Sequence, residues 1–140
     1  MSEQPNQPAK ISVDSGTTWE ALAGYSRAVR YGNQIYISGT TATDENGQVV
    51  GAGDPAAQAH YIIDKFERTL QQLGSTLDDV VRTRIYLRDI EQWEPVARAH
   101  GVRFGAIRPA NTLVQALLVG DEYLVEMEAD VVIGAGGKIK

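Results

Sequence analysis

Three carboxylates recur at every second position near the end of the chain. Glu126, Glu128 and Asp130 alternate with apolar residues in the segment 123–133. Because successive side chains of a β-strand point to opposite faces, the carboxylates would share one face and the apolar residues the other. Carboxylates can orient water or exchange protons in a binding site, but they also keep a surface strand soluble. The alternation by itself leaves both interpretations open.

Other residue types that carry catalysis are scarce. The 140 residues include two histidines, His60 and His100, and no cysteine. Disulfides, thiolate zinc ligands, cysteine nucleophiles and histidine-rich metal sites are therefore excluded. The glycine-rich segment 134–138 resembles a phosphate-binding loop, but Ile139 replaces the required Ser or Thr, so we expect a flexible end. The sequence predicts neither a metal nor a cofactor, which leaves carboxylates, hydroxyls and backbone groups.

The charge balance narrows the range of partners. The chain has 13 basic and 18 acidic residues and a net charge of -5, so we expect no nucleic-acid partner. No segment is apolar enough to span a bilayer, and residues 1–10 lack the apolar core of a signal peptide. We therefore expect a soluble, cytoplasmic protein without a membrane partner. Its length fits one domain, residues 1–140, with a partly irregular N-terminal segment at 1–20.

Two helices are predicted. The first begins after Asp54, which can cap it, and Pro55 suits the first helical position. It should end before Gly74, a residue that favours the left-handed C-terminal conformation. A second helix is predicted after Asp89, shortened or frayed by Gly101 and Gly105. Apolar residues at spacings of three and four form one stripe of the first helix: Ala59, Ile62, Ile63, Phe66, Leu70 and Leu73.

Strand patterns flank these helices. The segments predicted as strands are 26–31, 34–38, 48–50, 80–88, 112–118 and 123–133. The first two are joined by a turn-forming Gly-Asn pair, and the last two are predicted to form a second hairpin. In 80–88, we expect Arg82 and Arg84 to face the carboxylates of 123–133.

The order hairpin, helix, strand, helix, hairpin predicts an α+β fold. A mixed sheet would carry both helices on one face, because each helix has a single apolar stripe to cover. The other face, of mixed polarity, would be uncovered within this chain. That face is a candidate for contact between subunits of a homo-oligomer.

Seven short motifs occur in order between about Gly24 and Ile133. They are Gly24-Tyr25-Ser26-Arg27-Ala28-Val29, Ile37-Ser38-Gly39, Gln58-Ala59, Gly74 with the segment 77–83, the segment 86–89, Arg108-Pro109-Ala110, and the segment 125–129. In this set the chain resembles the RidA/YjgF family, also called the L-PSP endoribonuclease-like family. The resemblance implies a chorismate mutase-like fold, a barrel-like homotrimer, and clefts for a small-molecule ligand at the subunit interfaces.

The resemblance also implies an activity and a set of site residues. The best-characterised branch of the family hydrolyses reactive enamines and imines to keto acids and ammonia without a metal. By this similarity Glu126 orients the attacking water, and Tyr25 and Gly39 line the cleft. The backbone of Leu113 contacts the ligand.

The chain departs from that branch at several positions. Asn111 stands where the branch has an arginine that grips the substrate carboxylate, and a neutral amide binds a carboxylate less strongly than a guanidinium does. Arg108 would substitute only if its loop folds inward; otherwise it is a surface or interface residue. Ala97 and His100 stand where the branch commonly has asparagine and tyrosine, so His100 is either a cleft residue capable of proton transfer or a helix-end residue at a subunit contact.

These residues support one leading hypothesis and two alternatives. The leading hypothesis is a metal-independent hydrolase or deaminase of an imine, enamine or related metabolite without the usual carboxylate geometry. The first alternative is a homotrimer that binds a small molecule or a partner without turnover. A ribonuclease or translation inhibitor, as the family label suggests, is disfavoured by the acidic balance and the absence of a paired-histidine site.

Overall fold

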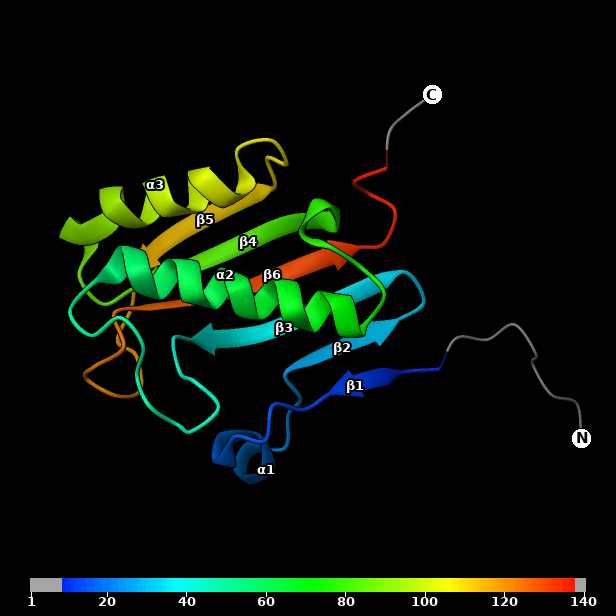
Figure 1. Ribbon diagram of the computed structural model, residues 1–140, viewed down its shortest axis with the longest axis horizontal. Coiled ribbons are helices and arrows are strands. Elements are labelled where there is room, and N and C mark those ends of the chain that lie inside the picture. Colours follow the sequence, from blue (N-terminus) through cyan, green and yellow to red (C-terminus); the bar gives the residue numbers. More distant parts are fainter. Residues whose placement is uncertain (1–8, 138–140) are drawn as a thin grey trace, which may run out of the picture.

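The computed structural model describes residues 9–137, which form a six-stranded mixed sheet in the order β1-β2-β3-β6-β4-β5 (Figure 1). The strands are β1 (Ile11–Val13), β2 (Ala28–Tyr31), β3 (Gln34–Thr41), β4 (Val80–Leu87), β5 (Ala110–Gln115) and β6 (Val125–Val132). All neighbours pair antiparallel except β4 and β5, which are parallel. The predicted α+β class with a mixed sheet is confirmed.

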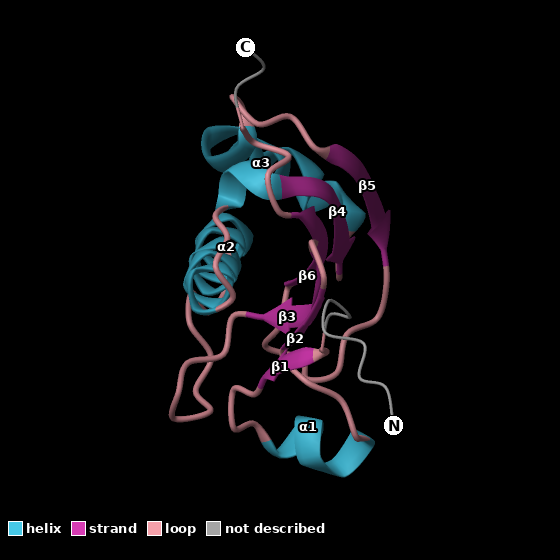
Figure 2. Ribbon diagram, turned by 90° about the vertical axis from the view of Figure 1, so that its right-hand side faces the viewer, coloured by secondary structure: helices cyan, strands magenta, loops and turns pink. Residues whose placement is uncertain are grey.

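Helices α2 (Pro55–Gln72) and α3 (Trp93–Phe104) cover one face of the sheet, as predicted, and α1 (Thr18–Ala23) lies beyond the β1 end (Figure 2). Short 3-10 turns, η1 (Leu77–Asp79) and η2 (Ile90–Gln92), precede β4 and α3. No helix within residues 9–137 combines the length and the apolar character that a membrane crossing requires.

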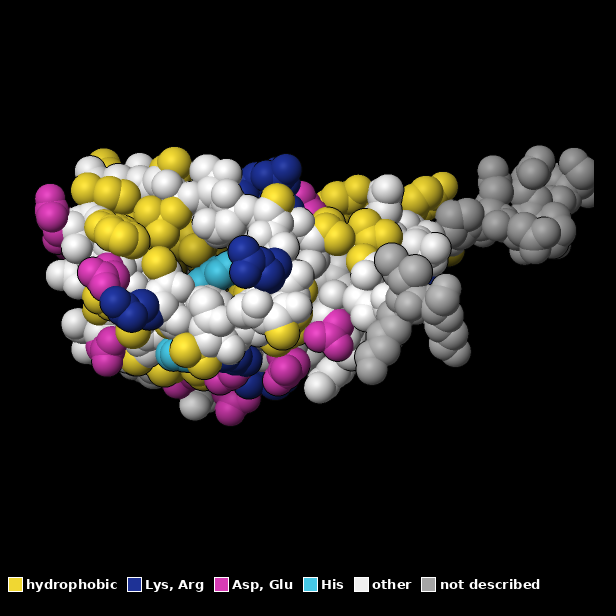
Figure 3. All heavy atoms as spheres, turned by 90° about the horizontal axis from the view of Figure 1, so that it is seen from above, with side chains coloured by type: hydrophobic (Ala, Val, Ile, Leu, Met, Phe, Trp, Pro, Cys, Tyr) yellow, Lys and Arg dark blue, Asp and Glu magenta, His cyan; other side chains and the backbone are white. Residues whose placement is uncertain are grey.

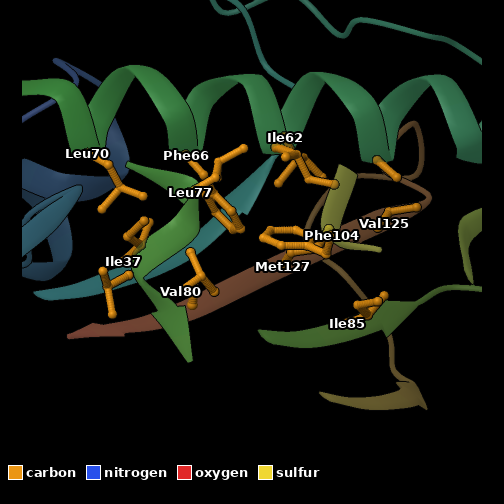
Figure 4. Close-up of a cluster of buried hydrophobic side chains, with 14 of the residues drawn as sticks. Ile37, Ile62, Phe66, Leu70, Leu77, Val80, Ile85, Phe104, Val125 and Met127 are labelled. Atoms are coloured by element: carbon orange, nitrogen blue, oxygen red, sulfur yellow. The ribbon is translucent and has the colours of Figure 1, made fainter. Parts of the chain in front are cut away.

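The apolar stripe of α2 packs onto the sheet and forms the core. The Asp54 carboxylate accepts a 3.0 Å hydrogen bond from the backbone N–H of Ala57, which caps the helix as predicted. Phe66 and Ile62 are fully buried, and they meet Met127 and Ile37 from the strands (Figure 4). Burial of this stripe is the main hydrophobic contribution that fixes α2 over β3 and β6.

The N-terminal segment, predicted to be partly irregular, contains two short elements within the described residues. Residues 11–13 form β1, which pairs with β2, and residues 18–23 form α1. Elements of three and six residues are too short to show a hydrophobic period or to be stable alone, so tertiary contacts create them. Residues 1–8 of the predicted irregular segment lie outside the described residues.

The second predicted hairpin is also wrong. β5 and β6 are not neighbours, because β4 lies between them and pairs with both. β5 instead runs parallel to β4, and α3 makes the crossover connection between them. Alternation assigns side chains to faces but does not identify the partner strand, which is why the hairpin was expected. The segment 48–50 forms an isolated bridge from Val49 to Thr43 and no strand.

The two-residue alternation of β4 is interrupted near the start of the strand. A register shift between Val80 and Arg82 leaves Val81 38% exposed, whereas Val80 is buried. From Thr83 onward the alternation holds. The expected pairing across strands is confirmed for Arg84, whose guanidinium lies 3.3 Å from Asp130 and 3.7 Å from Glu128.

Two smaller expectations concern the ends of elements. Helix α3 ends at Phe104, directly before Gly105 as predicted, but it continues through Gly101 without fraying. The glycine-rich tail, expected to be flexible, is held as far as it is described: the Asp79 carboxylate accepts hydrogen bonds of 3.1 and 3.0 Å from the N–H groups of Gly134 and Gly136. The buried Asp79 thus fixes the chain after β6 to the start of β4.

Arg88, which follows β4, fastens the loop that leads into β6. Its guanidinium donates to the carbonyls of Tyr123 at 2.8 Å, Leu118 at 2.9 Å and Gly120 at 2.6 Å. The charge of Arg88 therefore satisfies three loop carbonyls. Three hydrogen bonds from one cation hold this loop, including Val119, beside the sheet.

We predict that Arg88→Met lowers the free energy of unfolding by about 2 kcal/mol, because three partly buried carbonyls lose a charged donor. The matched control is Arg82→Met on β4, since Arg82 forms no ion pair or side-chain hydrogen bond within residues 9–137. Urea unfolding of both variants measures the difference. Equal losses would show that Arg88 has no special role in fastening the loop.

Candidate functional site

Glu126 lies in the middle of the sheet on the face that no helix covers. Its backbone pairs with Thr41 of β3 and Tyr86 of β4, and its side chain is half-buried. Burial raises the pKa of the Glu126 carboxyl, and the nearby Glu128 charge raises it further, while Arg27 acts in the opposite direction. Glu126 is therefore a carboxylate whose proton affinity is increased by its surroundings, as an acid–base group requires.

Gly39 provides the space that the Glu126 carboxylate occupies. A Cβ atom added at Gly39 would overlap Oε2 of Glu126. The register between β3 and β6 shifts between Ile37 and Thr40, so Gly39 lies at an irregularity that brings its backbone close to the carboxylate. Glycine is required here because of this close approach, and not because of its backbone angles.

A cavity of about 150 Å³ opens over this carboxylate. Three residues assigned to the cleft from the sequence, Tyr25, Gly39 and Glu126, lie together in its wall. Their roles toward a ligand stay predictions. The complete lining is Trp19, Tyr25, Arg27, Gly39, Thr41, Val119 and Glu126. We call this set the Glu126 group.

Arg27 is the member of the Glu126 group that the sequence analysis missed. It is 5% exposed, and it donates to Thr40 Oγ1 at 2.7 Å, to the Gly39 carbonyl at 3.3 Å and to the Glu20 carboxylate at 3.3 Å. Its Nε–H has no hydrogen-bond partner within the described residues. An arginine just before a short strand carries no periodic signal of burial, so only the structure reveals this role.

Glu20 is the partner that compensates Arg27. Burial alone would raise the pKa of Glu20, but hydrogen bonds from the Ser15 hydroxyl and backbone N–H, together with the Arg27 charge, lower it overall. Glu20 is therefore ionised, and it is the one buried residue of α1. The Glu20–Arg27 ion pair attaches α1, and with it Trp19, to the wall of the cavity.

Asn111 and His100 belong to a different place, on the helix side of the sheet. The Asn111 amide donates to Thr83 Oγ1 at 2.9 Å, and that hydroxyl lies 2.8 Å from Nε2 of His100. Thr83 is fully buried beneath α3, and burial lowers the pKa of His100. Neutral imidazole can accept from Thr83, whose oxygen then accepts from Asn111, so the three side chains satisfy one another.

The other predicted ligand contacts lie near Asn111. Leu113, two residues along β5, is half-buried and packs against the core. Arg108 is exposed, with a φ of 56°, and its N–H closes α3 by donating to the Phe104 carbonyl at 2.8 Å. We call Asn111, Leu113, His100 and Arg108 the Asn111 group.

A single chain does not bring the Glu126 group and the Asn111 group together. Asn111 pairs with Thr83, which faces the helices, whereas Glu126 faces away from them. β4 also separates β5 from β6. The sequence-predicted site is therefore split between two faces. The view onto the α3 side shows apolar side chains gathered at the surface there, and Trp93, Val102 and Val114 are exposed (Figure 3).

Within residues 9–137, no three His, Asp or Glu side chains are grouped in a way that could hold a metal ion. The polar groups of the 150 Å³ cavity are one carboxylate, one guanidinium and two hydroxyls. This set can position water, accept a proton and stabilise charge.

Comparisons with known proteins place the chain in a family. The family model described as Endoribonuclease L-PSP matches residues 16–133. The 3-aminoacrylate deaminase RutC of Acinetobacter baylyi is 34% identical over 120 residues, which are 86% of this chain and 94% of that protein. A RutC family protein of Pyrococcus abyssi is 32% identical over 109 residues, covering 77% of this chain and 85% of that protein.

Solved structures have the same fold. A Mycobacterium tuberculosis member of the YjgF/YER057c/UK114 family is 40% identical, with a TM-score of 0.81 over 89% of this chain and 100% of that one. YyfA of Yersinia pestis, a Rid family protein of unknown function, is 26% identical with a TM-score of 0.78 over 89% and 100% of the two chains. The chain belongs to the Endoribonuclease L-PSP family, the RidA/YjgF family.

We predict that Gly39→Ala displaces the Glu126 carboxylate toward solvent and returns its pKa toward the ordinary value near 4.5. The change in unfolding free energy should be about 1 kcal/mol, because the displaced atoms end a flexible side chain. NMR titration of the Glu126 carboxyl carbon measures the shift. The matched control, Gly101→Ala, adds a methyl group where no atom lies within 4 Å and should leave that pKa unchanged.

Proposed function

We propose that this protein hydrolyses a reactive imine, enamine or related small metabolite, with a water molecule oriented by Glu126. The observation that carries the proposal is the half-buried Glu126, with its raised pKa, in a cavity it shares with Tyr25 and Gly39. The similarity to a 3-aminoacrylate deaminase supports the same class of reaction. We expect the reaction to take place in the cytoplasm.

The proposed chemistry needs one carboxylate and no metal. Water adds to the electrophilic carbon of a protonated imine, and the Glu126 carboxylate accepts the proton that the water loses. Protonated Glu126 then returns that proton to the nitrogen of the tetrahedral amino alcohol. The C–N bond breaks to release ammonia, and the hydroxyl proton passes to the ammonia, which leaves a carbonyl compound and the Glu126 carboxylate. A carboxylate with a raised pKa is a better base for the first step than an exposed one.

The proposed assembly is a homotrimer with the ligand at subunit interfaces. The two groups of site residues lie on opposite faces of one chain, so a second chain is needed to place an Asn111 group against a Glu126 group. The uncovered sheet face is available for such a contact, since Tyr36 is 48% exposed there and Arg84 and Tyr86 are half-buried. Closed symmetry is the usual arrangement of homo-oligomers.

Asn111 determines which substrate is suitable. Its amide is neutral and already donates to Thr83, so it provides no charge for a carboxylate next to the imine. Charge-assisted hydrogen bonds are about twice as strong as neutral ones, so small 2-imino acids should bind weakly. We propose a substrate whose polar groups do not require the two-pronged grip of an arginine.

The hydrogen bond from Asn111 to Thr83 also favours a second candidate function. If Asn111 stays committed to Thr83, the protein is a homotrimer that binds a small molecule without turnover. The two candidates differ in whether imines are consumed.

We predict that Glu126→Gln abolishes ammonia release from freshly generated imines, because the amide accepts no proton from water. The control, Glu128→Gln, removes a carboxylate two residues away on the same face and should retain most activity. Glu128 is engaged by Arg84 and Tyr86 instead. If Glu126→Gln and Glu128→Gln are equally active, Glu126 is not the base. If the native protein itself is inert on all imines, the binding function is favoured over hydrolysis.

We predict that Asn111→Arg increases turnover of carboxylate-bearing imines relative to neutral ones by roughly tenfold or more, since it restores a charged donor. The ratio of kcat/KM for the two substrate types measures this preference. Asn111→Gln, which keeps a neutral amide, serves as the control. An unchanged ratio in Asn111→Arg would mean that position 111 does not contact the substrate.

We predict that the rate of imine hydrolysis rises with pH over a range that lies above the ordinary glutamate pKa of about 4.5. The reason is that Glu126 must be ionised to act as a base, and its folded-state pKa is raised. Between the unfolded-state and folded-state pKa values, Glu126 still holds its proton in the folded chain but has released it in the unfolded chain. Glu126 therefore lowers the stability of the fold as pH rises through this range. Glu126→Gln should therefore unfold at an equal or higher temperature at pH 7. A lower unfolding temperature would contradict the raised pKa.

A further inference from the structure

A second, larger cavity of about 740 Å³ lies between α2, the loop that joins β3 to α2, and the segment that leads into α1. In Figures 1 and 2 this loop and α1 lie at the same end of the molecule. We call this cavity the Lys65 cleft. It shares Trp19, Arg27 and Val119 with the Glu126 cavity but has its own polar residues. Its volume is within the range of small-molecule sites.

Lys65 is the central cation of this cleft. It is half-buried, and Nζ donates to the carbonyls of Thr41 at 3.0 Å and Thr43 at 2.9 Å. An ammonium group has three N–H donors, so one is not used by these carbonyls.

Further polar residues of α2 extend the same surface. Tyr61, Lys65, Arg68 and Gln72 follow one another at spacings of four, three and four, which places them on one side of the helix, and all line the cleft. Arg68 is exposed, forms no ion pair within residues 9–137, and its guanidinium carbon lies 5.8 Å from the centre of the Tyr61 ring. Its charge is free to meet a ligand at the cleft mouth.

Charges of both signs face the half-buried Lys65. Burial lowers the pKa of Lys65 to about 8, and Arg27 and Arg68 add to this effect, while Glu20 and Asp44 oppose it without cancelling it. Glu20 is engaged by Arg27, and Asp44 accepts from the N–H groups of Asn46 and Gln48.

The remaining carboxylates of the lining act only weakly on Lys65. Asp14, Glu45 and Glu122 are exposed to solvent, where water screens their charge. Tyr61, the other titratable group on this side of α2, is a phenol, which is uncharged at neutral pH. The half-buried Lys65 is therefore the group that would gain most from an added negative charge.

We propose that the Lys65 cleft binds a small anion with a carboxylate or phosphate-like group, which Lys65 and Arg68 contact. A dianion would offset the mutual repulsion of Lys65, Arg68 and Arg27, and it would accept a hydrogen bond from the unused N–H of Lys65. Such a ligand would stabilise the charged form of Lys65, so binding should take up a proton near pH 8. This site does not depend on imine hydrolysis, so either proposal can fail alone.

The test is titration calorimetry of the full chain with sulfate and with succinate, in two buffers of different ionisation enthalpy. Sulfate represents tetrahedral oxyanions and succinate represents carboxylates, so the preferred probe identifies the ligand class. At pH 8 we expect uptake of about half a proton per anion, and at pH 7 about a tenth, because Lys65 is then mostly protonated. Absence of binding by both probes would overturn the proposal.

Three variants assign the binding to the cleft. Lys65→Arg keeps a cation that does not titrate, so binding should persist while proton uptake at pH 8 disappears. Arg68→Gln should weaken binding about tenfold. The control is Arg98→Gln, whose arginine is exposed on α3 and paired with Glu94, and it should bind as the native chain does.

Thermal unfolding of each variant shows whether it is folded, and Arg68→Gln provides a test even if Lys65→Arg disturbs the loop. Proton uptake that is unchanged in Lys65→Arg, or affinity that is unchanged in Arg68→Gln, would place the anion elsewhere and overturn the proposal.

Discussion

The buried ion pair between Arg27 and Glu20 is the contact on which the arrangement around Glu126 depends. Both residues are 5% exposed, and the guanidinium also donates to Thr40 and to the Gly39 carbonyl. Removing one partner of such a pair typically costs about 3–5 kcal/mol, because the other charge is left buried. The pair thereby fixes the backbone of Gly39, against which the Glu126 carboxylate packs, and it anchors α1 with Trp19.

Arg27 also links the two cavities of the chain. It lines both, and its charge opposes the rise in the pKa of Glu126 while it adds to the fall in the pKa of Lys65. A single buried guanidinium therefore acts on the pKa of a carboxylate on one side and of an amine on the other, although burial is the larger cause of both shifts. Its three hydrogen-bond partners prevent it from moving toward either.

Local patterns predicted much of the fold. The Asp54 cap, the α2 stripe and the Gly32-Asn33 hairpin turn are features of neighbouring residues, and all are present. The errors concern long-range pairing: β5 was paired with β6, and β1 and α1 were not recognised. Each of these depends on which distant segment lies alongside, and side-chain alternation carries no information about that.

The sequence by itself determined that Glu126 lies on a polar strand face, and its motifs indicated the family. It also determined that Asn111 supplies no positive charge. Only the tertiary structure decided that Glu126 and Gly39 meet, that Arg27 is buried beside them, and that Asn111 faces the opposite side of the sheet toward Thr83. The physical reason is that periodicity fixes the direction of a side chain relative to its own strand, whereas burial, pKa and contact depend on which strands and helices pack around it.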